Sequence, residues 1–359
     1  MDKNRLDLYT DYLISSFSKV TATGLSNLLD NDLSHDRITD FLAESTLGPK
    51  ELWSLVKADI RKIESSEGVI CIDDTFIEKP YSDENEVISY YYDHSKGHNI
   101  KGMNLLNALY FNQETRIPLA FEVIHKDQEF IDPKDGKEKR RSSVSKNELC
   151  RQMLGQIQRN QVQFSYVLAD VWFASCDNMS FIVHKLHKHF VMPMKSNRLV
   201  ALDFEKLKEG SWVSISSLQI PETQWLQVYL KGLPFPVALC RQVFTNQDGS
   251  QGTIYLVCSD LSLTVDQAQA IYQKRWKVEE FHKSIKSNTG LAQSPTRVIR
   301  TQLNHVFSSI YAFVKLERLR HSTHLNHFAL KTKLYTHALK AAFLELQQTQ
   351  AKLALLAPS

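Results

Sequence analysis

The chain has 359 residues and a mass of 41.3 kDa, enough for a large hydrophobic core and for two or three domains. Hydrophobic residues make up 43% of it and charged residues 23%, proportions that are typical of globular proteins and exclude a disordered or fibrous chain. Because no apolar run approaches the ~20 residues of a membrane span and no signal peptide is recognisable, we expect a cytosolic protein without a membrane partner.

The net charge of +3 is small, but the charged residues are unevenly distributed. Residues 1–66 hold 8 Lys and Arg against 11 Asp and Glu, whereas residues 270–340 hold 13 against 3. This concentration of positive charge favours a surface that binds a polyanion such as DNA. A solvated basic surface without a partner is the alternative, and charge alone does not exclude it.

Residues 1–66 are expected to form a helical N-terminal domain, because apolar residues recur at helical spacing throughout them. Ser34 is placed to cap a helix over residues 35–42, and a preceding helix over residues 23–32 would complete a helix-turn-helix. Two interpretations remain open for this domain: it reads DNA through His35, Arg37 and Thr39, or it is a helical packing domain. Its net negative charge argues against strong DNA binding.

Residues 67–194 are expected to form the first part of an α/β core. A buried strand at residues 69–72 runs into Asp73 and Asp74, and a second one at residues 164–169 runs into Asp170. Further strands and helices are predicted around them: strands at 87–92, 105–111, 117–124 and 190–194, and helices at 145–158 and 175–187. The resulting order is typical of a ribonuclease-H-like catalytic core, and such a core needs one more acid on a later helix.

Two segments differ in character from this core. Residues 126–141 are polar and basic, and they are interpreted either as a solvated loop or as a loop that grips phosphate. Residues 195–263 consist of short β-rich runs separated by Gly, Pro and Asn-Gln-Asp-Gly turns, which indicates a β-rich insertion within the core. A helical C-terminal region is expected over residues 297–359.

Residues 264–296 are expected to contain the core helix that carries the missing acid. Thr264 and Gln267 form a capping-box pattern, and Asn288-Thr-Gly290 supplies a stop signal. On one continuous helix, four functional side chains would fall within roughly 60° of one another: Tyr272, Arg275, Glu279 and Lys286. An ordinary Arg–Glu ion pair on a surface helix is the simpler interpretation of this pattern.

Two strand-end aspartates and a glutamate on a helix suit phosphoryl transfer by two metal ions. Carboxylate oxygens hold Mg²⁺ or Mn²⁺, one ion activating the attacking oxygen and the other stabilising the leaving one. Asp73 and Asp74 compete for one role, because successive side chains of a strand point to opposite faces of the sheet.

Asp74, Asp170 and Glu279, with the spacing Tyr272-x2-Arg275-x3-Glu279-x6-Lys286, resemble the DDE transposases of bacterial cut-and-paste insertion sequences that carry the Y-R-E-K signature. The segment Ile72-Asp-Asp-Thr75 is similar to the first motif of that family, in which the second acid, Asp74, precedes the threonine. Leu168-Ala-Asp170 is similar to its second motif. The resemblance extends over roughly residues 20–320.

The resemblance implies that Asp74, Asp170 and Glu279 are catalytic and bind two Mg²⁺ or Mn²⁺ ions. It also implies DNA-binding side chains, which in this sequence are Tyr272, Arg275 and Lys286, with Lys195 as a further candidate. The expected partner is double-stranded DNA, as transposon ends and as target, bound by a homodimer in the bacterial cytosol or nucleoid. Two alternatives are a ribonuclease-H-like nuclease or resolvase without strand transfer, and a non-catalytic domesticated DNA-binding protein.

Overall fold

In the computed structural model, which describes residues 1–93, 96–245 and 248–356, the apolar run at residues 69–72 begins strand β1 (Val69–Glu78). This strand does not end at the acids, as the sequence suggested. It continues through them because Asp73 and Asp74 pair with Asn107 and Leu106 on the neighbouring strand β3 (His98–Asn112). Both acids therefore stand inside a strand, and their side chains leave opposite faces of the sheet.

The chain forms two compact units, which are described separately. The sheet unit comprises Pro49–Glu280, and the helical unit comprises Met1–Gly48 together with Phe281–Ser359. The division falls inside one continuous helix, α9 (Trp276–Asn288). The finer division into five segments that the sequence suggested stays a prediction.

The centre of the sheet unit has the predicted sequence of strands and helices, but β1 pairs with β3 and not with β2, the strand that follows it in the chain. Strands β1, β3 and β4 form an antiparallel meander, β7 lies parallel to β1, and β8 lies parallel to β7. Strand β2 pairs with the first residues of β3. The bounds of these strands, besides β1 and β3, are β2 (Ser89–Asp93), β4 (Thr115–Val123), β7 (Tyr166–Ala169) and β8 (His189–Met194).

The predicted β-rich segment between residues 195 and 263 continues this sheet instead of forming a layer of its own. Strand β13 pairs with β8, and the order then runs through β12, β11 and β9 to β10, so that the sheet has eleven strands within the described residues. The elements of this segment are β9 (Leu199–Ala201), α7 (Phe204–Glu209), β10 (Val213–Ser214), the 3₁₀ turn η2 (Ile215–Ser217), β11 (Leu226–Leu230), β12 (Val237–Thr245) and β13 (Gln251–Cys258).

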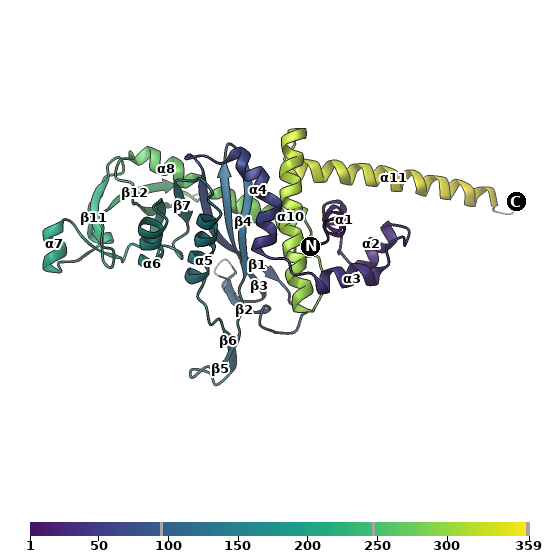
Figure 1. Cartoon of the computed structure of the whole chain (residues 1–359), viewed down its shortest axis with the longest axis horizontal. Coiled ribbons are helices and arrows are strands. Elements are labelled where there is room, and N and C mark those ends of the chain that lie inside the picture. The colour runs from purple at the N-terminus through teal and green to yellow at the C-terminus, as the bar shows by residue number, and fades with distance from the viewer. Residues whose placement is uncertain (94–95, 246–247, 357–359) are drawn as a thin grey trace. The chain divides into compact units, whose positions relative to one another are not determined.

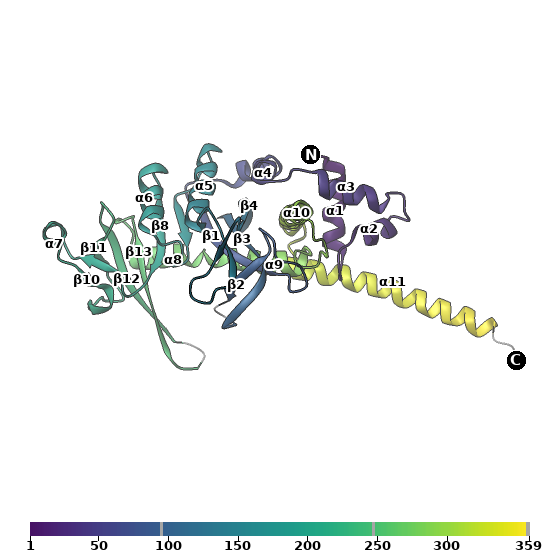
Figure 2. The same ribbon diagram turned by 90° about the horizontal axis from the view of Figure 1, so that it is seen from below.

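Helices lie on both faces of the sheet (Figure 2). One face carries α4, α5 and α6, and the other carries α8. Their bounds are α4 (Pro49–Ile63), α5 (Lys146–Arg159), α6 (Cys176–Ser180), which continues as the π-helix η1 (Phe181–Lys185), and α8 (Val265–Gln273). The two acids of β1 consequently meet different helices.

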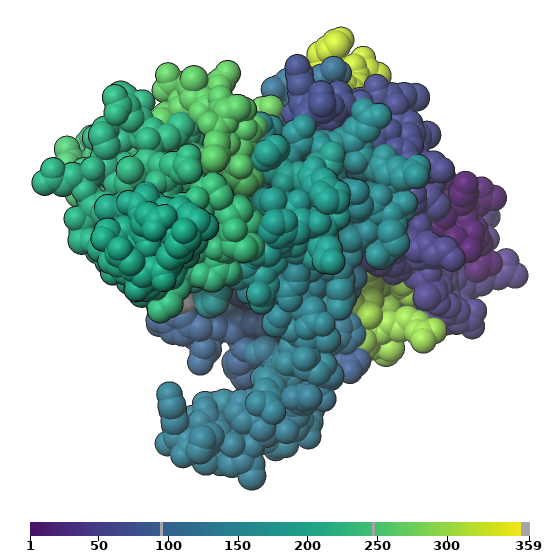
Figure 3. Space-filling model, turned by 60° about the vertical axis from the view of Figure 1, so that its left-hand side comes forward, coloured from purple at the N-terminus to yellow at the C-terminus, as the bar shows by residue number. Residues whose placement is uncertain are grey.

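The basic segment that follows β4 is neither of the two predicted loops but a β-hairpin. Strands β5 (Gln128–Ile131) and β6 (Glu138–Arg141) pair with each other, and the hairpin projects from the rest of the sheet unit (Figure 3). Two of its cations have acidic partners within the hairpin: Arg140 pairs with Glu129, and Lys139 pairs with Asp132 and Asp135. Part of its positive charge is thus neutralised locally.

The expected single helix over residues 264–287 is wrong, because the chain forms two helices, α8 and α9. The predicted capping box of Thr264 and Gln267 is present, and α9 ends at Asn288 before Gly290 at positive φ, as predicted. Between the helices, the backbone hydrogen bonds span three residues instead of four, and the Lys274 carbonyl accepts from the Cys71 thiol at 3.5 Å. The break interrupts the helix between Tyr272 and Glu279, but Arg275 still lies beside the Tyr272 ring and pairs with Glu279.

The helical unit is organised around α10, most of whose side chains are buried (Figure 1). Helices α1 and α3 pack on it, and α11 extends away from the rest of the unit (Figure 1). Besides the end of α9, the helices are α1 (Lys3–Ser15), α2 (Ala22–Leu28), α3 (His35–Glu44), α10 (Ile299–Thr323) and α11 (His327–Leu356). Ser34 caps α3 as predicted. Within the described ranges, these helices include none whose length and apolarity would suit a membrane span.

Asn304 links α10 to the segment after α3. Its buried side chain donates to the carbonyl oxygens of Leu42 and Ser45 at 2.8 and 2.7 Å and accepts from the Leu47 backbone N–H at 3.2 Å. Because Asn304→Ala would leave these backbone groups without partners, we expect it to lower the free energy of unfolding by about 2 to 4 kcal/mol.

Urea-induced unfolding followed by circular dichroism measures this loss. As a control, Gln348→Ala on the exposed part of α11 should change the free energy of unfolding by no more than about 0.5 kcal/mol. Equal stabilities of the two variants would show that the Asn304 contacts do not hold the unit together.

Candidate active site

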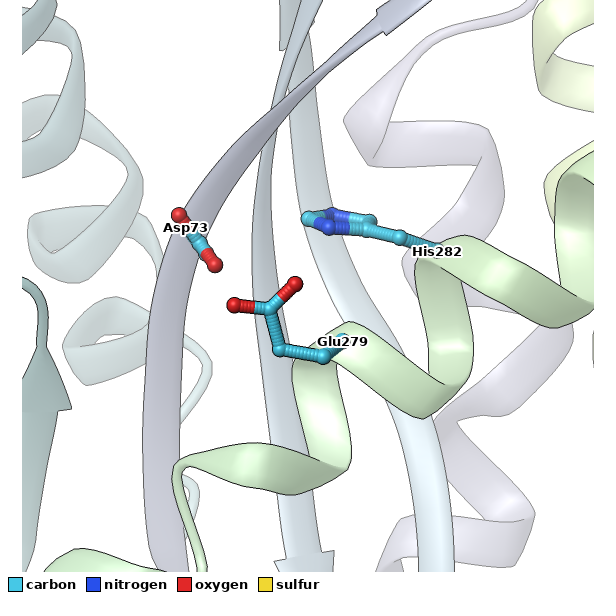
Figure 4. A group of neighbouring side chains, drawn as sticks. All are labelled: Asp73, Glu279 and His282. Carbon is cyan, nitrogen blue, oxygen red and sulfur yellow. The ribbon is translucent and has the colours of Figure 1, made fainter. Parts of the chain in front are cut away.

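Asp73 of β1 and Glu279 of α9 face each other across the gap between strand and helix (Figure 4). His282 lies one turn after Glu279 on the same helix, and its ring points to the same space (Figure 4). One ligand atom from each of these three residues lies within 4.8 Å of the others. In the described part of the chain, neither Asp74 nor Asp170 belongs to this close group.

Arg275 lies between the two carboxylates of this group. Its Nη1 atom is 3.4 Å from Asp73 Oδ2 and 3.3 Å from Glu279 Oε1. The guanidinium is largely buried, with 15% of its side chain exposed, and it also lies 5.8 Å from the centre of the Tyr272 ring. The protein thus supplies its own cation at the place where two acids meet.

The environment of Asp73 disfavours its charged form. Burial first, and then the negative charges of Glu279 and Asp170, raise the pKa of Asp73 to about 8, although the nearby Arg275 lowers it in part. The smaller part of this shift, after burial, reflects repulsion between Asp73 and the two other carboxylates. A divalent cation would remove that repulsion, as carboxylate clusters in metal sites do.

Asp170 follows strand β7 directly, beside β1, as the sequence predicted. It accepts from the Trp172 backbone N–H at 2.9 Å, which holds the turn after the strand. The pKa of Asp170 is raised on balance, mainly because the group is buried and further because of the charge of Asp74. The hydrogen bond from Trp172 opposes this shift. Asp170 is therefore within electrostatic range of both acids of β1.

Asp74 leaves the other face of β1 and meets helix α5. Lys146 Nζ donates to both of its carboxylate oxygens at 3.2 Å, and Asn104 Nδ2 donates to Oδ2. Only 10% of the Asp74 side chain is exposed. The two adjacent acids therefore have different protein cations, Arg275 for Asp73 and Lys146 for Asp74.

The predicted DNA-binding residues are spread over several elements. Tyr272 ends α8 beside Arg275, whereas Lys286 is exposed on α9, two turns after Glu279 and on the same side of that helix. Lys195 follows β8, and its ammonium lies 5.7 Å from the centre of the Trp172 ring. The DNA-binding role of these residues stays a prediction.

Sequence reasoning missed His282, Asn104 and Lys146. The spacing Glu279-x2-His282 was the available signal for the first, since residues three apart share a helix face. No local sequence pattern indicated that Asn104 and Lys146 contact Asp74. Both residues are distant from Asp74 in the chain, and only the positions of β3 and α5 in the fold bring them to it. The preference for Asp74 over Asp73 as the first ligand stays a prediction, although Asp73 is the acid that meets Glu279.

The residues present fit a hard divalent cation. Two carboxylates and an imidazole suit Mn²⁺, and carboxylate oxygens also suit Mg²⁺. Burial, and then the charges of Glu279 and Asp170, raise the pKa of Asp73, so a bound cation would favour the ionised form of this carboxyl group. Asp73, Glu279 and His282 could hold one cation, and Asp170 lies within electrostatic range of this group.

Residues 1–211 match the family model of the DDE superfamily endonucleases. The chain belongs to this family. The match spans more than half of the chain and includes Asp73, Asp74 and Asp170, but it ends before Glu279. Membership confirms the predicted ribonuclease-H-like fold class and places the chain among endonucleases that use divalent metal ions.

No curated protein matches the sequence. Among solved structures, the Drosophila P element transposase strand transfer complex matches with a TM-score of 0.25 and 10% sequence identity. This match covers 47% of the present chain and 33% of the other, so the chain corresponds to about a third of that transposase.

Loss of either facing acid should weaken cation binding. We expect Asp73→Asn and Glu279→Gln each to lower the affinity for Mn²⁺ by at least about tenfold, since a charged ligand is lost. Titration calorimetry in the absence of DNA measures the effect. Glu280→Gln is the matched control, because Glu280 pairs with Arg116 and Lys277 instead. The assignment is wrong if the two Glu→Gln variants bind Mn²⁺ equally well.

Cation affinity should also depend on pH. With a pKa of about 8, the Asp73 carboxyl is largely protonated at about pH 6 and largely ionised at about pH 9. Because a cation must displace the proton, we expect Mg²⁺ affinity to rise over this range and the rise to be smaller in Asp73→Asn. Calorimetric titrations at several pH values test this, and an affinity that is constant or falls with pH would contradict it.

Proposed function

We propose that this protein is a DNA transposase of the Y-R-E-K subgroup of bacterial insertion sequences. It would cleave DNA at the ends of its element and join the freed 3′-OH to target DNA by a cut-and-paste route. The observation that carries this proposal is that Asp73 of β1 lies close to Glu279 of α9 and within electrostatic range of Asp170 at the end of β7, in the central strands of a ribonuclease-H-like sheet. These elements are far apart in the sequence, so only a fold with this topology brings them together.

The proposed reaction has two phosphoryl-transfer steps. In the first, water attacks the phosphorus at the element end, the bond from phosphorus to the 3′ oxygen breaks, and that oxygen leaves as a 3′-OH. In the second, this hydroxyl attacks a phosphorus of the target and displaces another 3′ oxygen. Two divalent cations, when bound, would activate the attacking oxygen and stabilise the leaving one.

The chain itself would position these groups. The proposed catalytic and cation-binding residues are Asp74, Asp170 and Glu279, and Asp73 and His282 join them through their closeness to Glu279. Tyr272, Arg275, Lys286 and Lys195 would contact the DNA backbone, and Arg275 would also neutralise charge around the acids. Since two element ends must be joined in one event, we propose a homodimer in the DNA complex.

A nuclease or resolvase without strand transfer would use the same acids, so the reaction product separates the two proposals. A non-catalytic DNA-binding protein would not need them. The raised pKa values of Asp73 and Asp170, which come from burial and from neighbouring acids, favour an active site over that alternative, because such perturbed groups concentrate at functional sites.

Glu279→Gln should lower the rate of DNA cleavage by a factor of about 10² or more, because a cation ligand is lost. Its DNA affinity should stay within about twofold of that of the unchanged protein, because no positive charge is removed. The assay uses Mg²⁺ and DNA from the flanks of the gene, with Glu280→Gln as the active control. Normal cleavage by Glu279→Gln would show that this acid is structural.

The same assay with a target plasmid separates transposition from simple cleavage. Element ends covalently joined to the plasmid support the transposase, whereas cleavage without joined products supports the nuclease. Asp73→Asn and Asp74→Asn, made separately, identify the first ligand. If only Asp73→Asn loses activity, the preference for Asp74 is wrong.

A further inference from the structure

Lys146 is the first residue of α5, directly after the capping residue Ser145. A cation at the start of a helix is unfavourable, because the N-terminal end already carries partial positive charge. Here the side chain reaches Asp74 and donates to both carboxylate oxygens at 3.2 Å. The ion pair with Asp74 thus offsets the unfavourable position of Lys146 at the start of the helix.

The residues around the Lys146 ammonium carry oxygen atoms that are suitable ligands for a metal cation. Asp74 is nearly buried, and Asn104, which is fully buried, donates its amide to the same carboxylate. In the described residues, the other amide atom of this side chain, Asn104 Oδ1, is buried and has no hydrogen-bond partner. Amide and carboxylate oxygens are ligands of Mg²⁺ and Mn²⁺. The amide now presents its nitrogen to Asp74, so a cation bound there would gain Oδ1 as a ligand only after the amide turns over, which would also give this oxygen a partner.

Lys146 has a second neighbour outside the acid cluster. Its ammonium lies 5.6 Å from the centre of the Trp172 ring, and Lys195 lies 5.7 Å from the same ring. The Trp172 side chain is 58% exposed and that of Lys146 is 33% exposed, so a large ligand can reach both. An ammonium that left Asp74 would remain beside an exposed aromatic ring and a second lysine, a combination that suits the backbone of DNA.

We propose that Lys146 exchanges partners: it holds Asp74 while the site lacks a cation, and it binds a DNA phosphate once a divalent cation has taken the carboxylate. The exchange keeps the charge at Asp74 compensated in both states. It also couples the two binding events, since the cation frees the ammonium that then contacts DNA. This inference rests on the proposed function.

The first test measures Mn²⁺ affinity by calorimetry without DNA. Lys146→Met removes the competing ammonium, so we expect about tenfold tighter binding. Lys146→Arg keeps the charge and should bind like the unchanged protein. Lys195→Met is the matched control, because it removes the same charge from the same ring without a described carboxylate contact. Unchanged or weaker binding by Lys146→Met overturns the exchange, and circular dichroism verifies that each variant is folded.

The second test measures the affinity for a short DNA duplex as a function of KCl concentration, either with Ca²⁺ or with EDTA. Lys146→Met should lower the salt slope by about one with Ca²⁺ and leave it unchanged with EDTA. An equal decrease in both conditions would make Lys146 a permanent phosphate contact and overturn the exchange.

Neither test uses cleavage, so the two proposals can fail separately. If DNA is cleaved and joined but Lys146→Met binds Mn²⁺ normally, the exchange is wrong and the transposase proposal stands. If no cleavage occurs but Lys146→Met binds Mn²⁺ more tightly, the transposase proposal fails and the cation site at Asp74 remains.

Discussion

Strand β1 carries two adjacent carboxylates, and the protein must compensate both of them from opposite faces of one sheet. Arg275 lies against Asp73 and Glu279, and Lys146 lies against Asp74. Asp170, at the end of β7, adds its charge to both sides. Without these cations, the acids on β1, after β7 and on α9 would be harder to ionise, because burial and like charges disfavour the charged form. The rest of the sheet unit positions the elements that supply the acids and their counter-ions.

Much of this arrangement followed from local sequence patterns. The apolar run before Asp73 predicted a buried strand, and the alternation of side chains along a strand predicted that Asp73 and Asp74 point to opposite faces. The capping box at Thr264 predicted where α8 begins. These features depend on neighbouring residues, which explains why the order of strands and helices in the core could be predicted without knowledge of the contacts.

Features that depend on packing could not be predicted in this way. The turn between α8 and α9 contains no Gly or Pro, and it forms where the Lys274 carbonyl meets the Cys71 thiol of β1. Which acid of β1 faces Glu279 depends on which side of the sheet this helix pair covers. Lys146 lies 72 positions after Asp74 in the chain, and no spacing rule connects a helix start to a distant strand. The match to the DDE endonuclease family covers residues 1–211 and therefore does not include Glu279. Only the fold shows that Glu279 lies close to Asp73.

We infer that two cations of the protein, Arg275 and Lys146, stand where divalent cations bind. Anomalous diffraction from crystals grown with Mn²⁺ tests it most directly, because the signal locates the ion independently of activity. We predict Mn²⁺ at about 2.1 Å from carboxylate oxygens of Asp73, Asp74, Asp170 or Glu279. The Arg275 guanidinium or the Lys146 ammonium should then be displaced from its present partner. Mn²⁺ found only elsewhere, with both side chains still on their carboxylates, would contradict it.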